Sequence, residues 1–236
     1  MNKTINFDPY SPDTLPENFR PSELALVYTD HGRRTEFVLK KMLKTLCFDR
    51  KIPVLLFCDD FEKELLLEDL VPIVSSIPRT IVQCLESENT ARYITAEANE
   101  KVLAAKNMIQ NAPLNIEEVE RLPVREVCER AKKIVSGKQL EIIFVYADLA
   151  YLEDTVGSSC DCNLNEINDK IEIVSKGMMS YRLNTLKTLA RELNLPVVMV
   201  TNFTRNPDGI SNAELVAEIG SIPDIILYGG ASKNSR

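Results

Sequence analysis

The chain has 236 residues, of which 44% are hydrophobic and 27% charged, and this is enough for one folded domain with a sizeable core. Its net charge of −7 argues against broad, nonspecific adhesion to nucleic acid, although a local basic patch remains compatible with it. No apolar run approaches the roughly 18–20 residues that span a bilayer, and the N-terminus has no apolar signal segment, so we expect a cytoplasmic protein with no membrane partner.

The periodicity of the sequence predicts an alternation of strands and helices. The first 22 residues contain four prolines and predict an extended N-terminal arm, ahead of one domain at 23–236. Apolar runs predict buried strands at 24–28, 52–58, 140–147, 196–202 and 224–230. Amphipathic spacing predicts helices at 35–47, 61–74, 87–111, 124–135, 166–193 (interrupted near Gly177) and 211–219. The fold predicted is α/β, with a central, mainly parallel sheet and helices on both faces.

The six cysteines give no metal-binding pattern. Four of them lie in apolar segments, where cysteine behaves as a small hydrophobic residue. Cys160 and Cys162 form a C-x-C in a polar loop, whereas zinc sites usually show C-x₂₋₄-C with a second pair of ligands. We therefore expect no metal site in this loop.

The candidate ligand-binding residues are those that follow the predicted strands. In open parallel sheets, ligands bind at the carboxyl ends of the strands. The residues in those positions are 30–34, 58–60, Asp148 and 201–205. The helix predicted at 87–111 could also present a partner-binding face, but we favour a surface helix that packs through Ile94, Ala98, Val102 and Ala105.

Four segments, by their order and spacing, resemble the RecA-like ATPase core of DnaB-type replicative DNA helicases. They are NFRPSELALV, VLLFCDDFEKELLLEDL, LEIIFVYADLAYL and LNTLKTLARELNLPVVMVTNFTR. In that family they correspond to the first strand, the second strand and its helix, the Walker B strand, and the strand before the Q-L-N-R segment. The resemblance implies a RecA-like P-loop NTPase fold.

The P-loop itself departs from the pattern G-x-x-x-x-G-K-[ST]. In that pattern, backbone N–H groups surround phosphate, the lysine contacts phosphate and the hydroxyl binds Mg²⁺. Gly32 matches the second glycine, but Val27 stands at the first, Arg33 at the lysine and Arg34 at the hydroxyl. A shift by one residue pairs Arg34 and Thr35 with the lysine and hydroxyl, but then Arg33 replaces a glycine. The resemblance therefore implies weakened or lost binding of ATP and Mg²⁺ by Gly32, Arg33, Arg34 and Thr35.

Four further positions receive roles through the resemblance. Asp60 matches the catalytic glutamate and is one methylene shorter, while Asp148 matches the Walker B aspartate that orders Mg²⁺. Asn202 matches the glutamine that senses the γ-phosphate, and Arg205 is the cation offered to DNA by the loop after the fourth predicted strand. The helical N-terminal domain and the C-terminal strands of the helicases have no counterpart in the sequence.

Three functions follow as hypotheses. The first is a degenerate helicase relative that acts in DNA replication or its control by binding a helicase, another RecA-like subunit or its own copies, with DNA contact possible and weak or no ATP hydrolysis. The second is an active ATPase or helicase with Arg33 in place of lysine. The third is a regulator that binds a nucleotide without metal through His31, Arg33 and Arg34.

Overall fold

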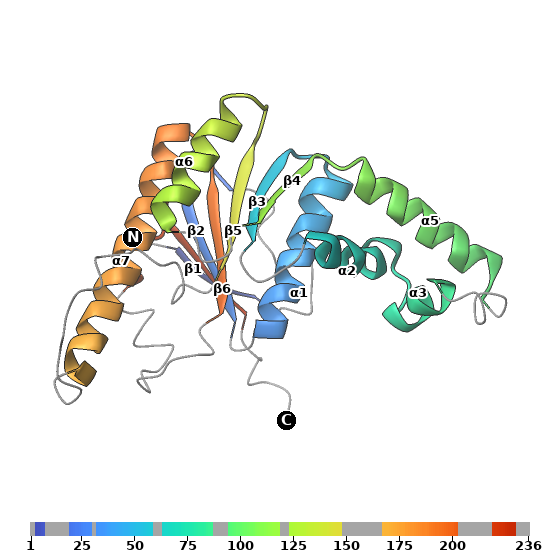
Figure 1. The fold of residues 1–236 in the computed structure, drawn as a ribbon, viewed down its shortest axis with the longest axis horizontal. Helices are drawn as coiled ribbons and strands as arrows, with labels where there is room; N and C mark the ends of the chain where they lie inside the picture. Colours follow the sequence, from blue (N-terminus) through green and yellow to red (C-terminus); the bar gives the residue numbers. More distant parts are fainter. Residues whose placement is uncertain are drawn as a thin grey trace.

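The computed structural model describes residues 3–7, 19–29, 32–58, 63–86, 94–118, 123–147, 167–202 and 219–229. Within them, seven strands form one parallel sheet in the order β1-β7-β2-β6-β5-β3-β4 (Figure 1). The strands are β1 (Lys3–Phe7), β2 (Leu24–Thr29), β3 (Val54–Cys58), β4 (Leu114–Glu118), β5 (Ile142–Tyr146), β6 (Val197–Asn202) and β7 (Ile225–Gly229). The predicted α/β class and parallel sheet are confirmed.

The two edge strands were not predicted. β1 pairs with β7, and β4 pairs with β3, so each has one strand neighbour in the described sheet. Their sequences, KTINF and LNIEE, lack the continuous apolar runs of the central strands, because an edge strand is not enclosed on all sides. Residues 3–7 are thus extended, as the expected arm would be, but they are part of the sheet.

The described helices cover both faces of the sheet, with α1, α2 and α5 on one side and α6 and α7 on the other (Figure 1). They are α1 (Gly32–Leu43), the π-helix η2 (Lys44–Asp49), α2 (Lys63–Ser75), α3 (Arg79–Glu86), α5 (Ala96–Gln110), α6 (Val124–Val135) and α7 (Ile167–Leu193). No helix among the described residues is long and apolar enough to cross a membrane.

The alternation of side chains along the strands divides the core into two layers. Val27 of β2 belongs to the cluster under α1, α2 and α5, whereas its neighbour Leu26 belongs to the cluster under α6 and α7, and both are fully buried. At the end of β2, the rings of Tyr28 and Tyr228 stack with their centroids 4.9 Å apart. A sheet buried on both faces explains why its central strands read as continuous apolar runs.

Two helix predictions require correction, and one helix was not predicted. α7 runs without a break through Gly177, because one glycine lowers helix propensity without ending a long helix. The helix predicted at 87–111 begins at Ala96, where Thr95 caps it by accepting a hydrogen bond from the Ala98 N–H. α3 was missed, because eight residues give too short a window for periodicity.

The packing predicted for the 87–111 segment is confirmed in part: Val102 and Ala105 are buried, and Ile94 and Ala98 are half-buried. Residues 87–93, and residues 211–218 of the helix predicted at 211–219, lie outside the described residues.

Candidate functional site

The candidate site lies at the edge of the sheet where the strands end. In the parallel register, Thr29 of β2 is paired with Asn202 of β6 and with Gly229 of β7. β3 and β5 end together as well, with Cys58 paired with Tyr146. The topology therefore brings several strand ends together at one edge of the sheet. Ligand-binding residues are expected directly after these strand ends.

The connection between β2 and α1 is very short. β2 remains paired through Thr29, and α1 begins at Gly32. Val27, at the position of the first P-loop glycine, is not in the connection but within the strand, fully buried between Val200 and Leu227 of the neighbouring strands. Only residues 30 and 31 separate the strand from the helix, and both lie outside the described residues.

A buried hydroxyl pair joins the two ends of this connection. Thr35 is fully buried, and its Oγ lies 2.7 Å from the Oγ of Thr29, which is also fully buried. This hydrogen bond fixes the first turn of α1 to the end of β2 inside the protein. Sequence reasoning considered Thr35 as a Mg²⁺-binding hydroxyl and missed Thr29, because a single threonine at a strand end belongs to no motif.

The remaining predicted residues are placed only in part. The backbones of Gly32, Arg33 and Arg34 form the first turn of α1, and the backbone of Asn202 ends β6. The residues that lie outside the described part of the chain are His31, Asp60, Asp148, Cys160, Cys162 and Arg205. Among the described residues, no group of three or more His, Cys, Asp and Glu side chains could hold a metal ion.

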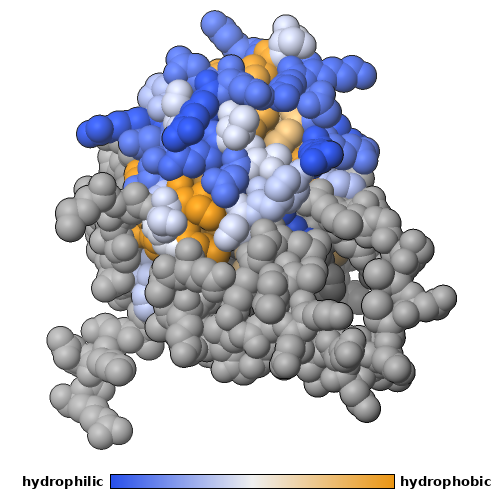
Figure 2. Space-filling view, turned by 90° about the vertical axis from the view of Figure 1, so that its left-hand side faces the viewer, coloured by the Kyte–Doolittle hydropathy of each residue, from blue (hydrophilic) through white to orange (hydrophobic). Residues whose placement is uncertain are grey.

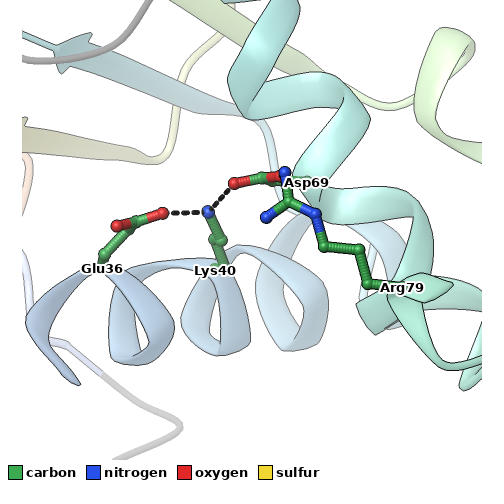
Figure 3. A network of polar contacts seen from close by, with 4 residues as sticks. All are labelled: Glu36, Lys40, Asp69 and Arg79. Carbon is green, nitrogen blue, oxygen red and sulfur yellow. Dashed lines mark hydrogen bonds and ion pairs between the residues drawn. The ribbon is translucent and has the colours of Figure 1, made fainter. Parts of the chain in front are cut away.

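α1 is tied to its neighbours by a network of ion pairs (Figure 3). The residue Lys40 is 5% exposed. Its ammonium contacts Glu36 one turn earlier and lies 2.5 Å from Asp69 Oδ2 on α2. Asp69 Oδ1 lies 2.8 Å from Arg79 Nη2 at the start of α3. The i,i+4 spacing of Glu36 and Lys40 was visible in the sequence, but the contact with α2 was not.

A carboxylate from β4 fixes the start of α2. Glu118 Oε1 accepts a hydrogen bond of 2.8 Å from the backbone N–H of Lys63. The first N–H groups of a helix have no partner within the helix, so a carboxylate at this point both satisfies one of them and complements the helix dipole. The first residue of α2, Lys63, is therefore fixed to the edge strand β4.

Comparison with known proteins identifies the family. The family model described as the DnaB-like helicase C terminal domain matches residues 13–214. The chain belongs to this family. Among solved structures, the chain is similar to one whose title describes an ATPase domain, with a TM-score of 0.64 and 18% identity over 89% of this chain and 70% of that one.

It is equally similar to a structure titled "The Structure Of A DnaB-Like Replicative Helicase And Its Interactions With Primase", with a TM-score of 0.64 and 18% identity. The match covers 89% of this chain and 47% of that one, so this chain spans about half the length of that helicase. No curated protein matches the sequence. The family and fold inferred from the resemblance are confirmed, and at this level of identity the structural matches establish the fold alone.

Proposed function

We propose that this DnaB-like domain acts in DNA replication or its control by binding other proteins, and that it hydrolyses ATP weakly or not at all. The observation that supports this most directly is the two-residue connection between Thr29 and Gly32. A P-loop surrounds phosphate with consecutive backbone N–H groups of a glycine-rich loop. A connection of two residues cannot supply that loop, and the β2 residues before it are engaged in the sheet.

The residues at the motif positions also fit ATP and Mg²⁺ poorly. Thr35 is the one residue among Arg33, Arg34 and Thr35 that has a hydroxyl, and this hydroxyl is buried against Thr29. Arg33 keeps the charge of the P-loop lysine, but a planar guanidinium differs in shape from an ammonium and is not equivalent at such a site. These features support a domain in which the RecA-like fold serves binding more than catalysis.

Calorimetry tests the proposal. ATP is titrated into the pure protein with Mg²⁺ and again with EDTA. We expect no heat of binding at high micromolar ATP in either condition. Micromolar binding that requires Mg²⁺, followed by turnover of ATP, would contradict the proposal.

The partner in this proposal is a replicative helicase, another RecA-like subunit or a second copy of the chain. Replacing Arg33 and Arg34 together with alanine should leave such protein binding largely intact, because the binding does not pass through an anion at α1. Loss of all protein binding on this change would show that the arginines belong to the interface or to an obligatory nucleotide site.

A second candidate function is an active ATPase, favoured by the strand ends that the sheet brings together. In it, Asp60 would act as the base, Asp148 would order Mg²⁺, Asn202 would sense the γ-phosphate and Arg205 would contact DNA. The adjacency of Thr29 and Asn202 in the register supports this arrangement. It predicts Mg²⁺-dependent turnover that Asp148→Asn abolishes, and turnover that survives this substitution would contradict it.

A third candidate is a regulator that binds a nucleotide without metal through His31, Arg33 and Arg34. The N-terminus of α1 carries no acidic residue in its first turn, which suits an anion. Binding that is unchanged in EDTA would separate this candidate from the second, and binding that needs Mg²⁺ would exclude it.

A further inference from the structure

The edge strand β4 pairs on one side only. Its neighbour in the sheet is β3, and no other described strand lies beside it (Figure 1). The carbonyl of Pro113 accepts a hydrogen bond of 2.8 Å from the Val54 N–H of β3. Along a paired strand, successive residues direct their backbone N–H and C=O groups to opposite sides, so Asn115 also faces β3 while Leu114 and Ile116 face the open side.

The backbone groups on this open side are not satisfied within the described chain. Among the described residues, the N–H and C=O groups of Leu114 and Ile116 have no hydrogen-bond partner on that side, although both residues are half-buried. A backbone polar group that is withdrawn from water without a partner costs free energy comparable to a lost hydrogen bond. Proteins often block such an edge with lysine or proline, and β4, LNIEE, contains neither.

The side chains of β4 indicate which strand would fit beside it. On one face, Leu114 and Ile116 pack, only half-buried, against the core cluster under α1, α2 and α5. On the other face, Asn115 Oδ1 accepts a hydrogen bond of 2.6 Å from Lys138 Nζ, and the half-buried Glu117 forms no ion pair with any described residue. A neighbouring strand places its side chains beside these, so a matching strand carries apolar residues on the first face and basic residues on the second.

The side of the molecule formed by α6 and α7 shows a contrast (Figure 2). Its surface is apolar in places, with hydrophilic side chains around them. Lys132 on α6 lies 3.1 Å from Glu129 and 3.0 Å from Glu192 on α7, so these charges are paired within the chain. β4 differs because it keeps hydrogen-bonding groups and a carboxylate that the described chain does not pair.

We propose that the open side of β4 binds an extended segment of a different protein, in which apolar residues alternate with basic ones. The segment adds to the sheet as a further strand, its backbone supplying hydrogen bonds and its alternate side chains supplying selectivity. This inference rests on the proposed function, in which the domain acts by binding proteins, and it names the chemistry of the partner. Its test contains no nucleotide, so ATP calorimetry and peptide binding can fail separately.

The probe is a synthetic peptide, Lys-Val-Lys-Val-Lys-Val-Lys, with both ends blocked, titrated into isotope-labelled protein and followed by nuclear magnetic resonance. We expect chemical-shift changes centred on 114–118 and slower hydrogen exchange of the Leu114 and Ile116 amides. Two further peptides are methylated on the backbone nitrogens of the valines or of the lysines. Each lacks the N–H groups of one side of the strand, so one of them should bind and the other should not.

Two substitutions test the same contact from the side of the protein. Ile116→Pro removes an outward N–H and leaves the groups that pair with β3, so peptide binding should be lost while circular dichroism shows the fold retained. Glu117→Lys should weaken binding of the lysine peptide roughly two- to fivefold and strengthen binding of a peptide with glutamate in place of lysine. The matched control, Glu100→Lys, reverses an exposed charge on α5 and should leave both affinities unchanged.

An absence of peptide-induced shifts at Leu114 and Ile116 would overturn the proposal. Equal binding of both methylated peptides would overturn it as well, because the contact would then not pass through the backbone. An unchanged preference for the lysine peptide in Glu117→Lys would remove the charge argument, even if Ile116→Pro failed to fold. Shifts at these two amides that depend on protein concentration without peptide would show that a second copy occupies the edge, and would overturn the assignment to a different protein.

Discussion

Lys40 Nζ on α1 lies 2.5 Å from Asp69 Oδ2 on α2, and the Lys40 side chain is almost fully shielded from water. The helix that follows the candidate site is thus joined to the next helix by a charge pair in the protein interior. A buried ion pair is weak evidence for net stabilisation, because the cost of removing two charges from water can match their attraction. Substitution of only one of the two partners should lower the free energy of unfolding, because the other charge loses its partner.

Lys40→Met should lower the free energy of unfolding by about 1–3 kcal/mol, because Glu36 and Asp69 lose the buried ammonium that they share, while Asp69 keeps its contact with Arg79. Lys40→Met combined with Asp69→Leu should recover part of that loss, because Asp69, the less exposed of the two carboxylates, is then no longer left without the ammonium. Urea unfolding followed by circular dichroism measures both. The matched control is Lys101→Met, which breaks an exposed pair with Glu97 and should change stability by less than about 1 kcal/mol. A single variant as stable as the control would contradict the argument.

Ser76 gives a prediction of the opposite sign. It follows α2, is exposed, and has φ of 58°, in the left-handed region that favours glycine. Ser76→Gly should therefore raise the free energy of unfolding by about 0.5–1 kcal/mol, the relief of backbone strain less the added freedom of the unfolded chain.

Ser136→Gly is the matched control, because Ser136 follows α6 with φ of −63°. There the glycine adds flexibility and removes the exposed hydrogen bond that Ser136 Oγ donates to Lys133 O, so stability should fall by about 0.5–1 kcal/mol. Thermal unfolding of the two variants should move in opposite directions, and a shift in the same direction would remove the strain argument.

The sequence was sufficient for the parts of the fold that depend on local pattern. β2, β3, β5 and β6 were predicted from apolar runs, and α6 was predicted with the bounds that the structure has. β1 and β4 escaped because an edge strand needs no apolar run, and its pairing is decided by a neighbour far away in sequence. The pairs Thr29–Thr35 and Lys40–Asp69 were also not predicted, because they are side-chain contacts that no spacing rule specifies.

Two cysteines that differ in burial, Cys47 and Cys84, should differ in reactivity. Burial raises the pKa of Cys47 to about 12, and its thiol is fully buried. Cys84 on α3 is half-buried. Since the thiolate is the reactive form, iodoacetamide at pH 8 should modify Cys84 much faster than Cys47 in the native protein. Peptide mass spectrometry measures both, and in urea the two rates should converge; equal rates without urea would contradict the described burial of Cys47.

Asp224 should make stability depend on pH in the acid range. Burial alone would raise its pKa, but hydrogen bonds from the Leu24 N–H and from Lys187, with the positive charges of Lys187 and Arg191, lower it below its ordinary value of 3.8. A lowered pKa means that the carboxylate stabilises the folded state above pH 3.8 and that this contribution is lost as the pH falls below it.

Asp224→Asn should therefore cost about 1 kcal/mol at pH 7, since a hydrogen-bonded charge between β2, β7 and α7 is lost. The difference between variant and wild type should shrink as the pH falls through 4 toward 2, because the wild-type carboxyl is then protonated as well. Urea unfolding at a series of pH values measures the difference. Lys132 and Glu192 form a solvent-exposed ion pair between α6 and α7, and Glu192→Gln is the control that should show little such convergence. A gap for Asp224→Asn that stays constant down to pH 2 would mean that the charge of Asp224 contributes nothing to the folded state.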